Sequence, residues 1–135
     1  MSTPEGKVKS KVDAILAKYT NVLINPTTKG YGKSGAADKI VCMNGQFIAI
    51  EVKSTQAVGI KKYPTKLQYR FLANVIRNRG RVAIINETNV DQLEHWLLHS
   101  NEPLMFEGCQ HPCVAEQAKE VTFWSKPTYW RSEGR

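Results

Sequence analysis

The sequence has none of the features that would place a chain in or across a membrane. No apolar run approaches the roughly 20 residues of a membrane span, and its first stretch, MSTPEGKVKS, lacks the apolar core of a signal peptide. It has only three cysteines, an odd number, so a fully paired disulfide framework is excluded. Without a secretion signal these thiols are expected to stay reduced. We therefore expect a cytoplasmic protein with no membrane partner.

Acidic residues are scarce relative to basic ones. The 135 residues include 19 Lys and Arg but only 12 Asp and Glu, which gives a formal net charge of +7. Such an excess favours a polyanionic partner such as DNA, although a protein that is simply basic would carry the same charge. Internal repeats and low-complexity tracts are absent too. A chain of this length is expected to form a single domain, residues 1–135, that buries a core without cross-links.

A hairpin signal lies near the middle of the N-terminal half. Two short runs of strand-type residues flank the dipeptide Asn44-Gly45; they are Lys39–Met43 and Phe47–Val52. Asn-Gly between such runs is typical of a two-residue type I′ turn, which needs positive φ at both positions. This turn would place Met43 opposite Gln46 and so fix the register of the whole hairpin.

The same register brings charged residues together. It places Asp38 directly opposite Glu51, with Cβ atoms about 4.5–5.5 Å apart on one face of the sheet. Like charges in this position destabilise a hairpin, so a cation is expected beside them. Lys53, two residues beyond Glu51, projects to the same face. Two carboxylates and an ammonium in one patch suit phosphate chemistry with Mg²⁺ or Mn²⁺.

An exposed hairpin with solvated ion pairs is the alternative. Apolar residues on both faces of the two runs argue against it. The carboxylate face carries Ile40, Cys42, Phe47 and Ala49, and the other face carries Val41, Ile48, Ile50 and Val52. This pattern favours an interior strand that is covered by helices on both sides.

The spacing of these residues resembles a known nuclease family. The pattern reads Gly35-Ala-Ala-Asp38, then Asn44-Gly45, then Ile50-Glu51-Val-Lys53, then Thr65-Lys-Leu-Gln68. In this order it resembles the PD-(D/E)xK nuclease superfamily, and within it the virus-type replication-repair nuclease (VRR-NUC) branch of stand-alone phage type. The resemblance covers about residues 5–90, and residues from about 101 to 135 would be a C-terminal extension. Ala37 stands where the family has a proline that shapes the turn.

The resemblance implies a fold, an activity and a set of site residues. The fold would be α/β, with a restriction-endonuclease-like core of a central mixed sheet flanked by helices. The activity would be Mg²⁺-dependent, structure-selective cleavage of DNA, as in Holliday junction resolution by a homodimer. The metal ligands would be Asp38, Glu51 and the main-chain carbonyl of Val52, and the other catalytic residues would be Lys53, Glu5 and Gln68. The alternatives are a flap or nicking nuclease on other branched or single-stranded DNA, and a non-catalytic DNA-binding module.

Glu5 and Gln68 also have structural interpretations. Thr3 is expected to cap a helix that starts at Pro4 and runs to about Lys18 on an apolar stripe. Glu5 lies on that stripe, but a carboxylate in a first turn also interacts favourably with the helix dipole. Gln68 comes three residues after Thr65, which is the spacing of a capping box.

Two loops with basic and aromatic residues flank the hairpin. Residues expected to contact DNA are Lys29, Tyr31 and Lys33 in the first loop and Lys61, Lys62 and Lys66 in the second. Lysines on flexible loops beside an active site suit backbone phosphates, although a solvated loop would look the same.

The spacing of apolar residues, together with the Gly and Pro residues that end helices and strands, predicts the remaining elements. A helix from Thr65, with Leu67, Phe71, Leu72, Val75 and Ile76 inward, should end before a C′-like Gly80. Expected strands are Asn21–Asn25, Arg81–Ile85, Leu104–Phe106 and Val121–Trp124, and a short helix is expected over Val90–His99. Arg77, Arg79 and Arg81 are expected on a basic face. The spacing of Cys109, His111 and Cys113 lacks the paired CxxC geometry of zinc sites, so a zinc site is not favoured.

Overall fold

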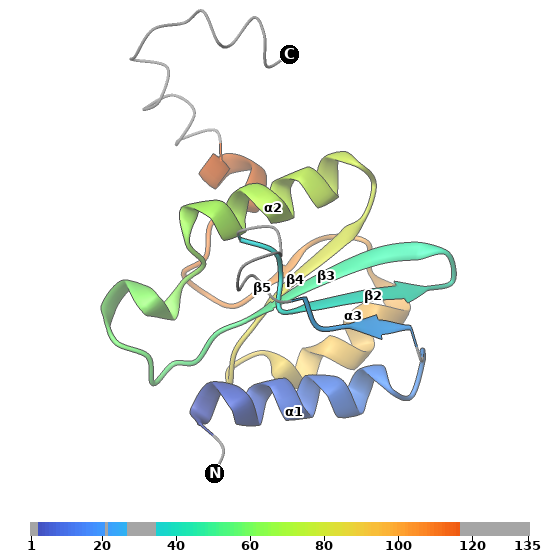
Figure 1. Ribbon diagram of the computed structural model, residues 1–135, viewed down its shortest axis with the longest axis horizontal. Coiled ribbons are helices and arrows are strands. Elements are labelled where there is room, and N and C mark those ends of the chain that lie inside the picture. Colours follow the sequence, from blue (N-terminus) through green and yellow to red (C-terminus); the bar gives the residue numbers. More distant parts are fainter. Residues whose placement is uncertain (1–2, 21, 27–34, 117–135) are drawn as a thin grey trace, which may run out of the picture.

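A five-stranded mixed sheet forms the centre of the protein, with helices on both faces (Figure 1). The computed structural model describes residues 3–20, 22–26 and 35–116. The α/β class and the mixed sheet flanked by helices are confirmed. The elements are α1 (Pro4–Leu16), β1 (Leu23–Ile24), β2 (Lys39–Met43), β3 (Gln46–Val52), the 3₁₀ helix η1 (Gly59–Lys62), α2 (Lys66–Arg77), β4 (Arg81–Ile85), the 3₁₀ helix η2 (Val90–Gln92), α3 (Leu93–His99) and β5 (Leu104–Met105).

The strands follow one another across the sheet in chain order, and the direction of pairing changes at β3. The β1–β2 and β2–β3 pairs are antiparallel, whereas β3–β4 and β4–β5 are parallel. The connection between β3 and β4 includes α2, as parallel neighbours require a crossover. The carboxyl ends of β3, β4 and β5 therefore meet at one edge of the sheet.

The predicted hairpin is confirmed in both turn and register. Asn44 and Gly45 have φ values of 54° and 77°, and Met43 faces Gln46. The ladder ends with Lys39 opposite Ile50. Asp38 is the residue just before this last pair, so the hairpin brings it beside the carboxyl end of β3.

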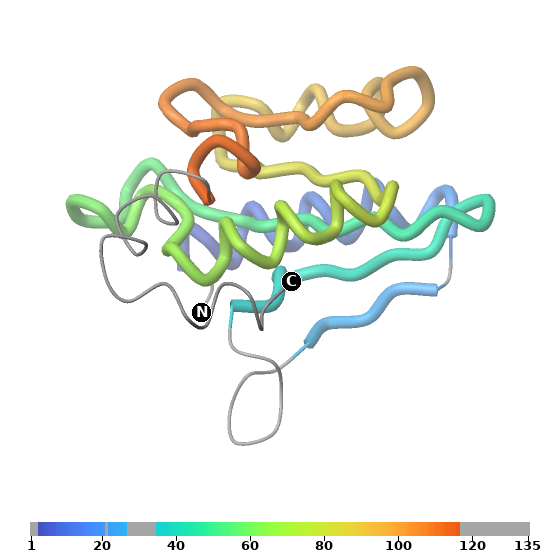
Figure 2. The backbone as a smooth tube through the Cα atoms, turned by 90° about the horizontal axis from the view of Figure 1, so that it is seen from above, coloured from blue at the N-terminus to red at the C-terminus, as the bar shows by residue number. Residues whose placement is uncertain are grey.

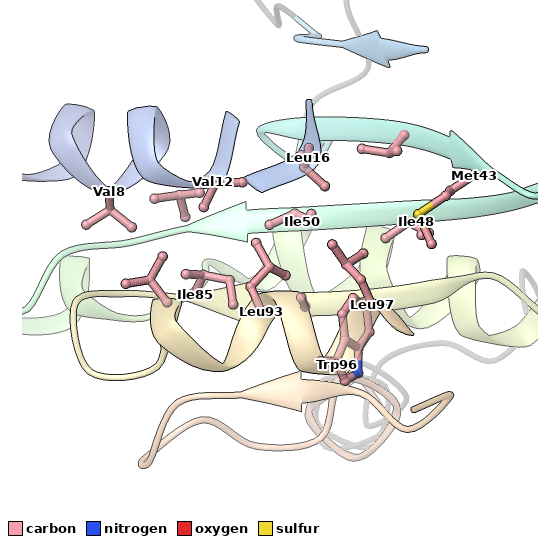
Figure 3. Packing of buried hydrophobic residues seen from close by; sticks show 14 residues of the cluster. Val8, Val12, Leu16, Met43, Ile48, Ile50, Ile85, Leu93, Trp96 and Leu97 are labelled. Carbon is pink, nitrogen blue, oxygen red and sulfur yellow. The ribbon is translucent and has the colours of Figure 1, made fainter. Parts of the chain in front are cut away.

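The helix α1 begins as predicted and ends slightly earlier. The Thr3 hydroxyl accepts a hydrogen bond from the Gly6 N–H at 2.9 Å, and the helix runs from Pro4 to Leu16. Together with α3, α1 covers one face of the sheet (Figure 3). The buried side chains labelled on this face are Val8, Val12, Leu16, Met43, Ile48, Ile50, Ile85, Leu93, Trp96 and Leu97.

The opposite face is covered by α2, which lies over β3 and β4 (Figure 2). Leu72 and Val75 are buried there as predicted, but Leu67 is 45% exposed, so its inward assignment was wrong. Leu67 lies instead against Gly35, where an added Cβ would come within 2.7 Å of it. Gly35 also has φ +84°, so both backbone angle and space favour glycine here. This close contact fixes the segment that leads to Asp38.

The end of α2 differs from the prediction. Arg79, and not Gly80, has the positive φ of 70°. The N–H of Arg79 donates to the carbonyl of Ile76 and that of Gly80 to the carbonyl of Val75, which is a Schellman motif with arginine at C′. Gly80 is needed for space, since an added Cβ would lie 2.6 Å from Val75 Cγ1.

Arg81 also differs from the prediction, because it does not belong to a basic surface. The residue is 5% exposed, and its guanidinium donates to the main-chain carbonyls of Trp96, Leu97 and Ser100. It also lies 4.3 Å from the centroid of the Trp96 ring. Arg81 therefore joins β4 to the end of α3.

The shorter elements agree with the sequence in kind. Of the strand predicted over Asn21–Asn25, the described residues form β1 at Leu23–Ile24, and the one predicted over Leu104–Phe106 forms β5 at Leu104–Met105. The strand predicted over Val121–Trp124 lies outside the described residues. In the described part of the chain, no helix is long and apolar enough to cross a membrane.

Candidate active site

Two carboxylates and two lysines meet beside the carboxyl end of β3. We call this group, Asp38, Glu51, Lys53 and Lys9, the carboxylate cluster. Asp38 lies just before β2, and its Oδ2 accepts a hydrogen bond from the Val52 N–H at 2.7 Å. This bond ties Asp38 to β3 one step beyond the last ladder pair. The juxtaposition of Asp38 and Glu51 therefore follows from the Asn-Gly turn.

Glu51 is the most unusual member of the cluster. It is 1% exposed, and its Oε1 has no hydrogen-bond partner among the described residues. The Lys53 ammonium lies 3.6 Å from the other carboxylate oxygen. Burial raises the pKa of Glu51 well above its usual value, and the charge of nearby Asp38 raises it further, while Lys53 partly offsets the rise. An ionised Glu51 thus lacks a cation that fully compensates for its burial.

Lys9 was not recognised from the sequence. Its ammonium lies 3.3 Å from Asp38 Oδ1 and 3.2 Å from Glu5 Oε2, so it bridges the two carboxylates. Burial alone would lower the pKa of Lys9, but the two carboxylates outweigh it and the pKa is raised. The only signal in the sequence was the favourable Glu5-to-Lys9 spacing of four residues on a helix.

Glu5 faces the cluster from the first turn of α1. Its carboxylate is half-exposed, and its charge is among those that raise the pKa of Glu51. Thr3 supplies the cap of this helix, and Glu5 lies in its first turn, the position in which a carboxylate interacts favourably with the helix dipole. Its catalytic role remains a prediction.

Gln68 forms the capping box that its spacing predicted. Its Oε1 accepts from the Thr65 N–H at 2.7 Å, and its own N–H donates to Thr65 Oγ1 at 3.2 Å. The structural interpretation of Gln68 is therefore confirmed. The capping box does not use its amide nitrogen, and the catalytic role predicted for Gln68 is untested.

The segment after Lys53 is fixed by a contact that the sequence did not suggest. Glu87, which follows β4, accepts from the Ser54 hydroxyl at 2.6 Å and from the Thr55 N–H at 2.8 Å. The Lys53 N–H donates to the Ile85 carbonyl at 2.9 Å. Although burial acts to raise the pKa of Glu87, the hydrogen bonds from Ser54 and Thr55 lower it. Lys53 is thus held on a backbone that β4 and its following turn support.

The predicted DNA-contacting residues fall into two groups. Lys61 and Lys62 are exposed on η1, and Lys66 is the first residue of α2. Lys29, Tyr31 and Lys33 lie outside the described residues. The second loop therefore places its basic residues between β3 and α2, on the chain segment that leaves the carboxylate cluster.

The donor set of the cluster suits a hard cation. Carboxylate oxygens and main-chain carbonyls are the ligands that Mg²⁺ and Mn²⁺ prefer, and the orphaned Glu51 Oε1 is a buried acceptor of this kind. Within the described residues, no group of three or more His, Cys, Asp or Glu side chains is arranged to hold a metal ion. At this cluster the available donors are Asp38, Glu51 and a backbone group such as the Val52 carbonyl.

The fold and the cluster define the chain as an α/β protein with a buried, incompletely neutralised carboxylate, Glu51, beside the partly exposed Asp38 at the end of a central strand. Comparison with protein-family models, with curated proteins and with solved structures gave no match.

Proposed function

We propose that this protein is a divalent-metal-dependent DNA endonuclease with a PD-(D/E)xK-type core of the VRR-NUC branch. The supporting observation is Glu51, a carboxylate that is 1% exposed in a mainly apolar strand and has one oxygen with no partner among the residues that the structure describes. Such a group is costly to ionise unless a cation joins it. Asp38 and Lys53 lie beside it, in the order and spacing that the family resemblance requires.

The residues present fit a Mg²⁺ or Mn²⁺ ion. Asp38 and Glu51 would hold it through carboxylate oxygens, with the main-chain carbonyl of Val52 as a further ligand. When bound, the ion would supply Lewis-acid stabilisation of the charge that develops on the phosphate. The Asp38 contact to the Val52 N–H, at 2.7 Å, keeps this carboxylate oriented toward β3 before any cation binds.

The lysines and the remaining polar groups act around this centre. Lys53, whose side chain is 12% exposed, would orient the attacking water and stabilise charge on the scissile phosphate. Glu5 and the free amide of Gln68 would complete the site. Lys61, Lys62 and Lys66 would bind backbone phosphates and position the strand without reading its sequence.

The proposed substrate is branched DNA, with a Holliday junction as the first candidate. The resemblance supports a homodimer, which would present two symmetric sites to two symmetric strands. The net charge of +7 agrees with any DNA substrate, because DNA is a polyanion. Cleavage of flaps or nicking of other branched or single-stranded DNA is the second candidate.

A non-catalytic DNA-binding module is the rival from another class. The geometry of Glu51 disfavours it, because a protein that only binds phosphate gains nothing from a buried carboxylate near the ligand. An assay that separates a nuclease from a DNA-binding module must therefore measure cleavage, because both would bind DNA.

The test is cleavage of labelled four-way junction, flap and linear duplex side by side, with Mg²⁺, with Mn²⁺ and with EDTA. We expect paired symmetric nicks in the junction, no cutting in EDTA, and two chains per junction in sedimentation. Cutting of one flap strand by a monomer would favour the second candidate. Absence of cutting of every substrate with either metal would overturn the nuclease proposal.

Asp38→Asn is the sharpest variant for this test. Its amide oxygen can still accept from the Val52 N–H, so the local fold is retained, while the charge that would hold a metal is lost. We expect cleavage to disappear and DNA binding to be equal or tighter, because negative charge near the phosphate is removed. Retained cleavage would exclude Asp38 from the metal site.

A further inference from the structure

A second site lies at the carboxyl ends of the three parallel strands. A pocket of about 450 Å³ opens there, within the size range of small-ligand sites. Its lining comes from the segments after all three strands: Thr55 follows β3, Asn86 follows β4 and Phe106 follows β5. Ligands of open α/β sheets bind in crevices of this kind. Figures 1 and 2 show the loop after β3 and the segment after β5 at the same end of the molecule.

Asn86 gives the pocket a fixed hydrogen-bond donor. The residue is 4% exposed, and its Oδ1 accepts from both the N–H and the hydroxyl of Thr88, at 2.8 and 2.6 Å. Since an amide nitrogen cannot accept these bonds, the side chain cannot be flipped. Its Nδ2 has no partner among the described residues, and the residue lines the pocket. Nδ2 is not one of the buried polar atoms that lack a partner, so in the free protein it can reach water, and an acceptor on a ligand would take the place of that water.

Tyr63 gives the pocket an aromatic surface. Its ring packs against Phe106, with centroids 6.0 Å apart, and an added Cβ at Gly108 would lie 3.1 Å from its Cε1. These neighbours fix the ring, yet Tyr63 remains 39% exposed. A rigid aromatic ring that is partly open to solvent is a stacking surface for a flat, conjugated ligand.

The charges around the pocket indicate what kind of flat ligand fits. Glu107 on its wall would repel a bare phosphate and can accept from an amino group, while the Asn86 amide can donate to a carbonyl or ring nitrogen. Lys62 adds one cation beside Tyr63. These groups are complementary to a planar ligand that has hydrogen-bond donors and acceptors on its edge. They also leave room for one phosphate beside that ligand.

The pocket is linked along the chain to the carboxylate cluster. Thr55 comes two residues after Lys53, and its N–H is bound to Glu87. Lys53 and the pocket wall at Thr55 therefore belong to the same segment at the end of β3.

We propose that this pocket binds one unpaired nucleobase of the DNA strand that enters the carboxylate cluster. Tyr63 stacks on the base, the Asn86 amide donates to its edge, and Lys62 binds the adjoining phosphate. The inference rests on the proposed DNA cleavage and adds to it a specific requirement: the substrate has an unpaired base next to the scissile phosphate. Since the arms of a four-way junction are fully paired, this requirement favours the second candidate substrate, other branched or single-stranded DNA.

The test is an abasic scan. A forked duplex with two unpaired arms is compared, by fluorescence anisotropy in EDTA, with forks in which one abasic nucleotide replaces each of the first unpaired positions in turn. In the wild-type protein one position should weaken binding about 5- to 100-fold, the range expected when one stacked base is lost. In Tyr63→Ala the intact fork should bind with the same loss, and the abasic nucleotide should then cost nothing more.

Three variants keep the test specific. Tyr63→Phe retains the stacking ring and should behave as wild type. Ile60→Ala removes an 88% exposed apolar side chain from the same loop and should also behave as wild type. Asn86→Asp keeps the acceptor for Thr88 but replaces the donor, so it should shift the preferred base at that position toward one with a donor edge. Melting temperatures verify that each variant is folded.

The outcomes separate this inference from the nuclease proposal. If no abasic position weakens binding, or if the abasic nucleotide costs wild type and Tyr63→Ala the same factor, the base pocket is excluded. A free deoxynucleotide that competes as well as the strand would likewise overturn the assignment to a strand. Cleavage of the same fork by wild type with Mg²⁺ is scored independently, so either proposal can fail alone.

Discussion

Two charged clusters lie next to each other in this protein and differ in one respect. The carboxylate cluster contains Asp38, and the next residue, Lys39, forms a second cluster with Asp13 and Asn25, which we call the lysine cluster. Helix α1 serves both, because it gives Lys9 to the first and Asp13, one turn later, to the second. Lys39 is 6% exposed, and its ammonium donates to Asp13 Oδ2 at 3.1 Å and to Asn25 Oδ1 at 2.7 Å.

The difference is whether the buried charge is satisfied. In the lysine cluster the buried ammonium has oxygen partners at hydrogen-bond distance, and the contact joins α1 to the sheet. Asp13 Oδ1, like Glu51 Oε1, is buried without a hydrogen bond in the described part of the chain, but it lies 3.0 Å from the Lys39 ammonium. In the carboxylate cluster, Glu51 is more deeply buried, and its nearest cation, the Lys53 ammonium, lies 3.6 Å away. One of its oxygens has no partner within the described ranges. A satisfied buried charge stabilises a fold, whereas an unsatisfied one weakens it and indicates a function that retains it. Substitutions in the two clusters should therefore have opposite consequences.

The largest effect is expected for Glu51→Gln. Under the proposed function, loss of this ligand should reduce cleavage about 1000-fold or more, since a metal contributes several kcal/mol to the transition state. The melting temperature without metal should be equal to or higher than that of wild type, because a buried, poorly compensated carboxylate is removed. Cleavage rate and thermal unfolding are measured on the same preparation. A variant that melts much earlier would mean that Glu51 is structural.

For Lys39→Met we expect lost stability with retained cleavage, the opposite of Glu51→Gln. The substitution removes a buried ammonium with two partners, and we expect a loss of about 2 kcal/mol in the free energy of unfolding. Asp13, whose side chain is 41% exposed, can regain water, which limits the cost. Cleavage per folded molecule should persist. Lys11→Met on the exposed side of α1 is the control and should change stability little; equal losses in both would contradict the structural role of the lysine cluster.

The sequence predicted these clusters unequally, for physical reasons. The Asn44-Gly45 turn has one favoured geometry, so the register and the position of Asp38 followed from local chemistry. Lys9 could not be identified, because which of several lysines on α1 faces the site depends on how the helix docks on the sheet. Arg81 was misassigned because a charged residue is normally exposed, and its three carbonyl partners come from the end of a helix that only the tertiary fold brings near.

A smaller effect is expected for Lys9→Gln. Lys9 occupies the side of Asp38 where a cation would be favoured, so it competes with a divalent ion for that carboxylate. Removing it should tighten Mn²⁺ binding about 3- to 10-fold, because a half-exposed ion pair contributes at most about 1 kcal/mol. Calorimetric titration measures this directly, with Lys7→Gln on the same helix as the control. Weaker Mn²⁺ binding in Lys9→Gln would show that Lys9 supports the metal site and does not compete with it.

The smallest expected effect is on the pH dependence of stability. It is measured by comparing Glu51 with Glu87, a carboxylate whose hydrogen bonds are satisfied. The pKa of Glu51 is raised, so its folded form keeps a proton that the unfolded chain releases above 4.5, and stability falls as pH rises past that value. The pKa of Glu87 is lowered, so its contribution is present above 4.5 and is lost as pH falls through the lower folded value.

Glu51→Gln and Glu87→Gln should therefore differ from wild type in opposite directions at neutral pH. Without metal, Glu51→Gln should be the more stable and Glu87→Gln the less stable, the latter by less than about 1 kcal/mol because this group is largely solvated. Both differences should vanish well below pH 4.5, where each carboxyl is protonated in the folded and unfolded states alike. Melting curves of wild type and both variants, recorded from below pH 4.5 to neutral pH, measure these differences in stability. If both variants moved in the same direction at neutral pH, the contrast between a satisfied and an unsatisfied carboxylate, on which the choice of Glu51 as the metal ligand depends, would be lost.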